Sequence, residues 1–390
     1  MTHLFKQIKE FLLYLNMALQ RRSFLTRLGL GLGAIVTASF ESAGNTIKKK
    51  MENFDPIIDV QPMGFQWETM DPFLFCVHHE DYFPKGNDQM GPAESLAGRS
   101  LGDDFIIKDG YRMYHGKKVP GFPGHPHRGF ETVTVVRKGL VDHADSMGAA
   151  GRYGNGDVQW MTAGKGVQHS EMFPLLSKEK DNPLELFQIW LNLPSVKKMS
   201  EPHFSMFWSE NIPKLTLENK EHKKTYIEII AGNFNKTKSL NPPPNSWAAN
   251  PQHEVAIWNV IMEKGGSITL PKTSDGVNRM LYFYEGQDIA IAGNTVSSYK
   301  SVKLRTNQDV EVIATSENCK FLILQGKPIN EPVMQYGPFV MNTKEEIQQA
   351  FQDYHETQYG GWPWPRYDQV HDRNKGRFAK YADGKIEERV

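Results

Sequence analysis

Cysteine is almost absent from this sequence. Of 390 residues only two are cysteines, Cys76 and Cys319, and neither lies in a CxxC pattern. Structural zinc ribbons and iron–sulfur clusters need several thiolates, so both classes of site are excluded. Any metal site must be built from histidine and carboxylate side chains. The two thiols could pair in an oxidising compartment, but we interpret them as buried free cysteines.

An excess of charge of one sign is also lacking. The chain has 45 basic and 45 acidic residues and a formal net charge of +0. It contains no long basic stripe with interleaved aromatic residues, which is the usual mark of a nucleic-acid-binding surface. Nucleic acid is therefore not an expected partner.

Long hydrophobic runs are absent as well. The apolar stretch at residues 28–38 is too short to cross a bilayer as a helix. It follows QRRSFL at residues 20–25, and paired arginines before a short, weakly apolar segment are typical of a twin-arginine export signal. We expect residues 1–45 to be an export signal and leader, cleaved after Ala38 or Ala43, and the mature protein to be periplasmic, without stable membrane insertion. The alternative is an amphipathic N-terminal helix with a chance arginine pair.

Turn-forming residues are abundant, with 33 glycines and 23 prolines. They separate short runs of alternating or β-branched residues, such as TVTVV at residues 132–136. This pattern predicts an all-β protein. The length exceeds what one hydrophobic core usually supports, so we expect two tandem β domains, each a sandwich or barrel.

Composition changes suggest the domain limits. The first domain is expected at residues 46–194 and the second at 214–342, joined by a polar linker at 195–213 that contains proline. The second domain has no H-x-H pair, so we expect it to carry no metal ligands.

A long polar segment, residues 78–119, interrupts the first domain. Connections of this length are usually binding loops, lids or insertions. Its first residues are interpreted as a solvated loop tip, because adjacent histidines on a strand would point to opposite faces. These residues are His78, His79, Glu80 and Asp81.

The C-terminal part, residues 343–390, is predicted to begin with a helix. Thr343 and Glu346 fit a capping box. Four side chains then fall on one helical stripe that should pack against the body of the protein: Ile347, Ala350, Phe351 and Tyr354. The charged, glycine-punctuated remainder is expected to be an extended or partly disordered tail.

The strongest chemical pattern lies between Gly121 and Met172. His125 and His127 are two residues apart, as are His169 and Glu171, and side chains two apart on a strand point to the same face. Two strands could therefore aim four ligands at one divalent ion. Imidazole and carboxylate suit iron, copper, nickel, manganese or zinc. Four such ligands leave positions for water or substrate, which is a catalytic rather than a closed structural arrangement.

Spacing does not decide which glutamate binds the ion. Glu131 lies four residues after His127 and keeps the same strand parity, whereas Glu171 lies two after His169. Four further residues are candidates for lining the pocket or supporting the ligands, with ordinary barrel core as the alternative: Phe122, Phe130, Gln159 and Met161.

The strings HPHRGFETVTVV and GDVQWMTAGKGVQHSEM, with GPFVMNTKEEIQQAF near the C-terminus, resemble the pirin family of bicupins. The resemblance covers residues 55 to 355 and implies two tandem cupin-type β-barrels with one metal in the first. The ligands it implies are His125, His127, His169 and Glu171, so that Glu131 would only support them. The export signal, the 78–119 segment and the tail depart from the family pattern.

The same resemblance implies two functions. Some pirins resemble quercetinases, which open a flavonol ring with dioxygen on a mononuclear metal. If this chain acts in the same way, iron is the expected ion and a small phenolic is the expected substrate. Glu171 would then take the proton of the substrate hydroxyl. Other pirins resemble non-enzymatic metal-binding or redox-responsive proteins that act through a protein partner. A third possibility is a metal that only stabilises the barrel.

Overall fold

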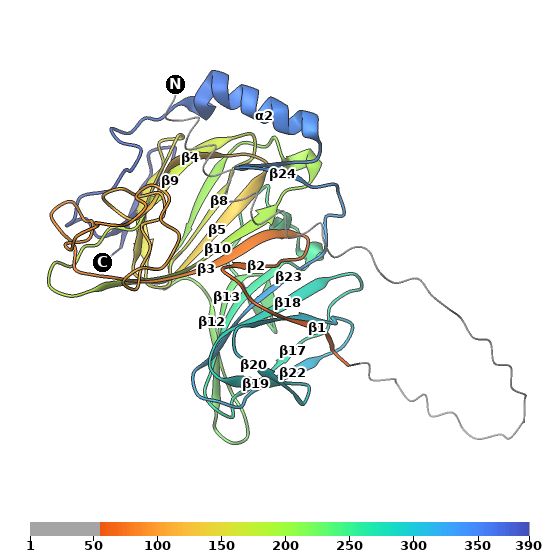
Figure 1. The fold of residues 1–390 in the computed structure, drawn as a ribbon. Coiled ribbons are helices and arrows are strands. Elements are labelled where there is room, and N and C mark those ends of the chain that lie inside the picture. Colours follow the sequence, from red (N-terminus) through yellow and green to blue (C-terminus); the bar gives the residue numbers. More distant parts are fainter. Residues whose placement is uncertain (1–54, 390) are drawn as a thin grey trace, which may run out of the picture. The chain divides into compact units, whose positions relative to one another are not determined.

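Antiparallel strands are the main regular elements of the computed structural model, which describes residues 55–389. The predicted export signal at residues 1–45 lies outside them. Two β-barrels are connected in tandem and followed by one α-helix (Figure 1). The prediction of an all-β chain with two barrels and a C-terminal helix is confirmed.

Two six-stranded sheets form the first barrel. One sheet, in the order β11-β8-β5-β10-β3-β2, contains β2 (Gln66–Trp67), β3 (Phe73–Phe83), β5 (Phe130–Lys138), β8 (Val158–Thr162), β10 (Asn182–Asn192) and β11 (His203–Phe207). The other, in the order β27-β26-β7-β6-β9-β4, contains β4 (Gly121–His127), β6 (Leu140–Asp145), β7 (Ala150–Gly154), β9 (Val167–Met172), β26 (Arg377–Lys380) and β27 (Ile386–Arg389).

The second barrel combines a seven-stranded and a four-stranded sheet. The larger, in the order β1-β21-β18-β23-β16-β13-β12, contains β1 (Ile57–Pro62), β12 (Lys214–Glu218), β13 (Lys224–Ala231), β16 (Ala256–Met262), β18 (Asn278–Glu285), β21 (Lys300–Leu304) and β23 (Cys319–Gly326). The smaller, in the order β17-β22-β19-β20, contains β17 (Ser267–Leu270), β19 (Asp288–Ile291), β20 (Asn294–Ser297) and β22 (Val310–Ala314).

Short elements complete the chain. Two small hairpins pair β14 (Asn233–Phe234) with β15 (Thr237–Lys238), and β24 (Met334–Tyr336) with β25 (Phe339–Met341). The 3-10 turns are η2 (Ser195–Lys197), η3 (Trp247–Ala249), η4 (Pro251–His253) and η5 (Gln358–Gly360). The helix is α2 (Lys344–Thr357), and the predicted capping box between Thr343 and Glu346 is present at its start.

The large sheets of the two barrels pack against each other. Val133 and Val135 of β5 share one buried apolar cluster with Ile257 of β16, and Trp67 stacks on Tyr282 with ring centroids 5.0 Å apart. Because side chains alternate along a strand, the other face of β5 points into the first barrel. The sheet that carries the inter-barrel core therefore also forms one wall of the candidate site.

Strand β1 differs from the prediction. We assigned the residues before 62 to the first domain, but β1 pairs with β21 at the edge of the second barrel's larger sheet. Alternation in the sequence marks a strand without naming its partner. The first barrel therefore begins after this strand.

The expected linker at 195–213 also differs. Its residues His203–Phe207 form β11, which pairs with β8 of the first barrel. Pro202 and Pro213 flank this part of the chain rather than interrupting the strand, and Phe204, Met206 and Phe207 are buried. The first barrel thus extends to residue 207.

The start of the 78–119 segment is not a solvated loop tip. Residues 78–83 belong to β3 and pair with β10, and His78, His79 and Asp81 are buried. The two histidines do point to opposite faces, as adjacent strand residues must. His78 stacks on Phe187 of the inter-barrel core, whereas the His79 ring lies against Phe122 of β4.

The tail beyond α2 is ordered rather than disordered. Strand β26 adds to β7 of the first barrel, and Arg152 of β7 anchors the segment before it. The Arg152 guanidinium donates to both carboxylate oxygens of Asp142 at 2.7 and 2.8 Å, and to the backbone carbonyls of Asp372 and Lys375 at 2.7 Å each. A buried arginine thus binds chain segments more than 200 residues apart in sequence.

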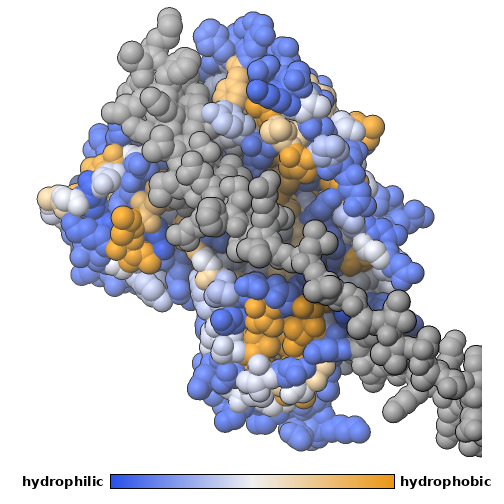
Figure 2. Space-filling view, turned by 45° about the vertical axis from the view of Figure 1, so that its right-hand side comes forward, coloured by the Kyte–Doolittle hydropathy of each residue, from blue (hydrophilic) through white to orange (hydrophobic). Residues whose placement is uncertain are grey.

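Both cysteines are buried and free, as interpreted from the sequence. On the surface, the face drawn in Figure 2 shows several separate apolar patches among hydrophilic side chains. Within residues 55–389 no helix is both long enough and apolar enough to span a membrane.

Replacing Arg152 with Met should release the tail. Removing one partner of a buried ion pair leaves the other charge uncompensated and costs about 3–5 kcal/mol. We expect that loss in the free energy of unfolding, measured by urea denaturation, together with rapid proteolysis near residues 370–376. Arg366→Met, which removes a partly exposed pair with Asp368 in the same tail, should cost under about 1 kcal/mol. Equal losses for the two variants would contradict this role of Arg152.

Candidate metal centre

Strands β4 and β9 bring three histidines together. They pair antiparallel with His125 directly opposite His169, and a bulge between Phe122 and His125 sets this register. His127, two residues along, points to the same side. One ring nitrogen from each of the three imidazoles lies within 4.8 Å of the others, which is close enough for all three to bind one ion. The sequence-based pairing of the H-x-H and H-x-E motifs is therefore present in three dimensions.

The protonation state of these histidines suits a metal. His125 Nδ1 lies 2.9 Å from the carbonyl oxygen of Pro123, and His127 Nδ1 lies 3.3 Å from that of Pro338. A carbonyl can only accept, so each Nδ1 carries the proton and each Nε2 keeps a free lone pair. Burial lowers the pKa of His125 to about 4 and that of His127 well below its usual value. Both imidazoles are therefore neutral near pH 7, which is the form that can bind a metal.

His169 gives the most direct indication of an ion. It is fully buried, burial lowers its pKa well below the usual value, and neither ring nitrogen has a hydrogen-bond partner within residues 55–389. A buried polar group without a partner costs about 1–3 kcal/mol. A metal bound to one of these nitrogens would remove part of that cost, so the residues present fit the group.

Glu171 lies beside this cluster. Its Oε2 is 3.8 Å from His169 Nε2, its Oε1 accepts from the Thr134 hydroxyl at 2.9 Å, and its Oε2 accepts from the Gln188 amide at 2.9 Å. Burial raises the pKa of this carboxyl. The two hydrogen bonds fix the carboxylate at the edge of the imidazoles, and its role as the fourth ligand stays a prediction.

Glu131 does not belong to the group of side chains that converge with the three histidines. Its Oε1 accepts from the Thr162 hydroxyl at 2.6 Å and its Oε2 from the Ser246 hydroxyl at 2.5 Å. It shares the face of β5 with Val133 and Val135 of the inter-barrel core, where burial raises its pKa to about 7. The parity argument failed because β4 ends at His127 and β5 begins at Phe130, so alternation does not continue across the turn.

The predicted pocket residues fall into two groups. Phe130 packs on His127 with ring centroids 5.0 Å apart, and the half-buried Phe122 ring is 6.3 Å from that of His125. Gln159 and Met161 lie on the face of β8 opposite Val158, which belongs to the inter-barrel core, so they point into the first barrel. Met161 packs in a small apolar cluster with Val167.

A buried lysine supports the loop after His127. Lys198 Nζ donates to the carbonyl oxygens of Gly129 and Val340 at 2.9 and 3.1 Å, and to Asn192 Oδ1 at 2.8 Å. Burial lowers its pKa to about 8. It therefore ties the His127 loop to the β24–β25 hairpin, whose Pro338 carbonyl orients the His127 ring.

The helix and tail contact both ligand strands. The Tyr354 hydroxyl of α2 donates to Gln168 Oε1 at 3.0 Å, and Gln168 Nε2 donates to the carbonyl of Gln358 at 2.5 Å. In the tail, the carbonyl of Tyr367 accepts from the backbone N–H of Gly124, next to His125, at 2.8 Å. The C-terminal segment is thus part of the candidate site's framework.

Sequence reasoning missed a further buried histidine next to this cluster. His143 on β6 lies directly opposite Glu171 on β9, its ring centroid is 5.5 Å from that of His169, and its Nε2 is 3.0 Å from Asp145 Oδ2. The string VDHAD could have indicated it, because residues 143 and 145 share one face of a strand.

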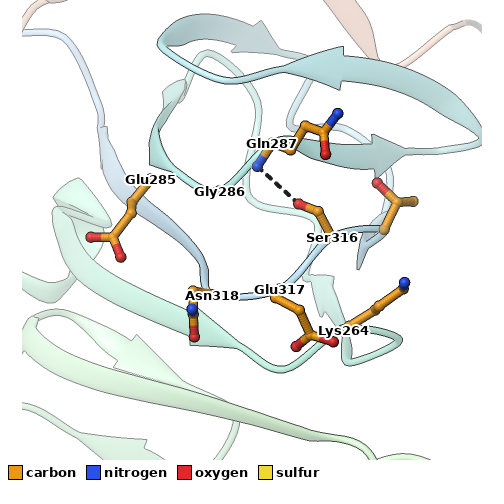
Figure 3. Close-up of a pocket in the computed structure, with 8 residues that line it drawn as sticks. Lys264, Glu285, Gly286, Gln287, Ser316, Glu317 and Asn318 are labelled. Carbon is orange, nitrogen blue, oxygen red and sulfur yellow. Dashed lines mark hydrogen bonds between the residues drawn. The ribbon is translucent and has the colours of Figure 1, made fainter.

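The second barrel has a different interior. It is filled by apolar side chains of both its sheets, among them Trp258, Phe283 and Phe321. At one end of this barrel the surface is hollowed by about 530 Å³ (Figure 3). The lining residues are Lys264, Glu285, Gly286, Gln287, Thr315, Ser316, Glu317 and Asn318. Among residues 55–389, the group of close histidine, cysteine or carboxylate side chains that could hold a metal is the one in the first barrel.

Replacing His127 with Ala should remove the metal. With one of three converging imidazoles lost, we expect affinity for Fe(II) or Ni(II) to fall at least about 100-fold, a larger effect than the 10- to 100-fold typical of residues that only support a ligand. Elemental analysis and competition with a chelator would measure it. Glu131→Gln, a matched control of the same size in the same barrel, should bind metal like the original protein. A loss of metal from Glu131→Gln equal to that from His127→Ala would contradict the assignment.

Comparison with known proteins agrees with this architecture. The family model described as Pirin matches residues 62–191, and the model described as Pirin C-terminal cupin domain matches residues 257–360. A Pseudomonas aeruginosa protein named "Putative quercetin 2,3-dioxygenase" is 36% identical over 262 residues, which cover 65% of this chain and 86% of that protein. A "Pirin-like protein" of Caulobacter vibrioides is 37% identical over 234 residues, 60% of this chain and 79% of that protein.

One solved structure is also similar. The crystal structure of a quercetin 2,3-dioxygenase from Acinetobacter baumannii has a TM-score of 0.61 at 27% identity, and the match covers 78% of this chain and 98% of that chain. The two matched family models span both barrels of the fold and the strands of the candidate metal centre. The chain therefore belongs to the pirin family.

Proposed function

We propose that the first barrel is a mononuclear metal centre that uses dioxygen to open the ring of a flavonol or a related phenolic. The observation that carries this proposal is the cluster of three converging, neutral imidazoles, two of them buried, beside a buried carboxylate. Names of similar proteins support it, since one relative is named "Putative quercetin 2,3-dioxygenase" and one solved structure is named quercetin 2,3-dioxygenase.

The ion we propose is iron, although nitrogen and oxygen ligands also suit copper, manganese, nickel or zinc. When bound, it would act as a Lewis acid on the phenolic oxygen and supply the redox chemistry with dioxygen. His125, His127 and His169 would hold it, and Glu171 is positioned to contribute a fourth ligand atom.

Glu171 is also the group that would take the proton of the substrate hydroxyl. Burial raises its pKa, which makes it a better base than an exposed carboxylate. Thr134 and Gln188 hold the carboxylate in place while it accepts and releases the proton. A positioned general base of this kind contributes a factor of about 10²–10⁴ to the rate.

Residues from the 84–120 loop provide an aromatic wall near the metal centre. The Phe122 ring contacts Tyr114 and Phe105 with centroids 5.1 and 6.4 Å away. The Tyr114 hydroxyl is fixed by Asp81 Oδ2 at 2.5 Å and His79 Nδ1 at 2.8 Å. A rigid aromatic surface 6.3 Å from His125, at Phe122, suits the flat face of a phenolic ring.

A role as a non-enzymatic metal-binding or redox-responsive protein with a protein partner is the alternative. It would be supported if a pull-down recovered one stoichiometric partner while the metal-loaded protein left phenolics unchanged. A metal that only stabilises the barrel would instead lower the melting temperature on removal, with no partner and no activity.

Metal-loaded protein should consume dioxygen with quercetin in an oxygen electrode. Glu171→Gln should lower kcat at least about 100-fold with metal content retained, because the amide cannot accept the proton. Glu131→Gln, the matched control in the inter-barrel core, should keep the original kcat. No oxygen uptake with quercetin or simple catechols, for protein loaded with iron, copper, manganese or nickel, would overturn the proposal.

Export to the periplasm through the twin-arginine route is part of the proposal, supported by QRRSFL at residues 20–25. This route carries folded proteins, so the metal centre would be assembled before transport. Changing Arg21 and Arg22 to Lys should leave the protein in the cytoplasm on cell fractionation, whereas changing Lys6 and Lys9 to Arg should not. Unchanged periplasmic recovery of the twin-lysine variant would refute the route.

A further inference from the structure

A segment without regular structure crosses the sheet that carries the candidate ligands. Residues 361–376, here named the strap, connect η5 to β26 and contain no helix or strand. Irregular connections of this length are uncommon in compact domains and are usually functional or disordered, and this one is ordered by its contacts. No residue of the strap is buried, so the strap adds little to the hydrophobic core. Core burial therefore does not account for its path.

The strap lies on the outer face of β4. Adjacent side chains on a strand point to opposite faces, so position 124 faces outward where His125 faces the other imidazoles. A Cβ atom on Gly124 would lie 2.5 Å from Cδ1 of Tyr367, because the tyrosine ring occupies the space that a side chain would need. The Tyr367 ring also stacks on Trp362, with centroids 5.5 Å apart and an interplanar angle of 8°. This ring therefore covers β4 directly behind His125.

The contact falls on an irregular part of β4. This strand is the last one of its sheet, and the bulge leaves Pro123 and Gly124 outside the pairing with β9. Edge strands and bulged residues lack part of the hydrogen-bond ladder. The strap supplies one of the missing bonds, since the Tyr367 carbonyl accepts from the Gly124 N–H at 2.8 Å.

The same peptide group orients a candidate ligand. The carbonyl of Pro123 and the N–H of Gly124 belong to one peptide bond, which is planar. The carbonyl accepts from His125 Nδ1 at 2.9 Å and so leaves Nε2 of that ring for an ion. When Tyr367 fixes the N–H, it also fixes the direction of the carbonyl, and through the carbonyl the imidazole.

Two more contacts hold the strap against β6. Trp364 Nε1 donates to the carbonyl of Asp145 at 2.8 Å, and Asp145 lies directly opposite His169. His371 Nε2 lies 2.9 Å from the carbonyl of His143, so this nitrogen carries the proton and donates it. The strap is therefore bound both to β4 and to the strand that pairs with β9.

Release of an ion requires its ligands to move apart, and local opening starts where the chain has few stabilising contacts. We propose that Tyr367 is a positioning residue for the metal centre. Through the peptide group before Gly124 it holds the His125 ring in its binding orientation, and it thereby slows release of the metal. The proposal rests on the metal centre of the proposed function, but not on the reaction proposed there.

The rate of Co(II) release tests this role. The full chain is reloaded with Co(II), whose visible absorption reports the coordination geometry, and transfer of the ion to excess EDTA is followed over time. Tyr367→Ala removes the ring behind β4, and Gly124→Ala displaces it with a Cβ atom. Each should speed release at least about 10-fold, the lower end of the effect on metal affinity of residues that orient a ligand. Tyr367→Phe keeps the ring and should release Co(II) at the original rate.

Tyr299→Ala is the matched control. Tyr299 is 43% exposed against 50% for Tyr367, and its backbone carbonyl also accepts from a neighbouring chain segment, the N–H of Met63. It lies in the second barrel, away from the candidate ligands. Its replacement should lower the melting temperature of the metal-free protein about as much as Tyr367→Ala does, and leave both the Co(II) spectrum and the release rate unchanged.

The possible results separate the positioning role from the proposed function. If both strap variants release Co(II) at the original rate, if Tyr299→Ala speeds release as much, or if Tyr367→Phe behaves like Tyr367→Ala, the positioning role is wrong while the proposed function stands. If the original protein binds no Co(II), both are overturned. Faster release with an altered Co(II) spectrum, restored by Tyr367→Phe, supports the role even when phenolics cause no oxygen uptake. Two strap variants are used so that the test survives if one fails to fold.

Discussion

The pairing of His125 with His169 across β4 and β9 is the constraint on which the candidate site depends. Because side chains alternate, a shift of one residue in this pairing would move an imidazole from the barrel interior to its outer face. The bulge between Phe122 and His125 allows Phe122 to face Glu171 and His125 to face His169 on the same strand pair. Burial then keeps the imidazoles neutral, which is the form that binds a metal.

Segments far away in the sequence stabilise that arrangement. The Pro338 carbonyl orients His127, Lys198 ties the following loop to Val340, and Tyr367 contacts the backbone beside His125. These contacts come from the linker region, the end of the second barrel and the C-terminal tail. The first barrel is therefore not an independent unit, since the geometry of the candidate ligands depends on contacts with the rest of the chain.

The alternation and spacing of residues predicted the candidate ligands better than they predicted which strands pair around them. The H-x-H and H-x-E motifs each lie within one strand, where alternation is reliable, and the structure brings three of their side chains together. The argument that Glu131 lies on the same face as His127 failed, because a turn separates the strands that carry the two residues. The capping box of α2 is a local signal and was found, whereas the partners of β1 and β11 depend on chain topology, which alternation does not encode.

The C-terminal tail shows that amino-acid composition alone does not predict whether a segment is ordered. Its charge and glycine content predict disorder on average, but the buried Arg152 offers hydrogen bonds to backbone carbonyls that only the folded barrel places together. Three buried side chains with unpaired polar atoms, those of His143, Tyr153 and Gln159, were hidden for a related reason. Each lies on a different strand, so only the closed barrel shows that they share one interior.

The sheet that contains β5, β8 and β10 has one face that packs against the second barrel and one face that points into the first barrel, toward the candidate site. Along β5, β8 and β10 most of the residues that face the second barrel are apolar, among them Val133, Trp160 and Phe187, and each of these contributes about 1.5–3 kcal/mol by burial. The alternating residues that face the first barrel include Thr134, Gln159 and Gln188. A polar group left without a partner costs about 1–3 kcal/mol, which is the same order as one apolar side chain contributes. The free energy gained by burying the apolar side chains of the inter-barrel core can therefore offset the cost of polar atoms without partners inside the first barrel. This explains how the first barrel keeps histidine, tyrosine and glutamine side chains with unpaired atoms. The second barrel has an apolar interior of its own. The outer face of its larger sheet provides the apolar surface against which the first barrel packs.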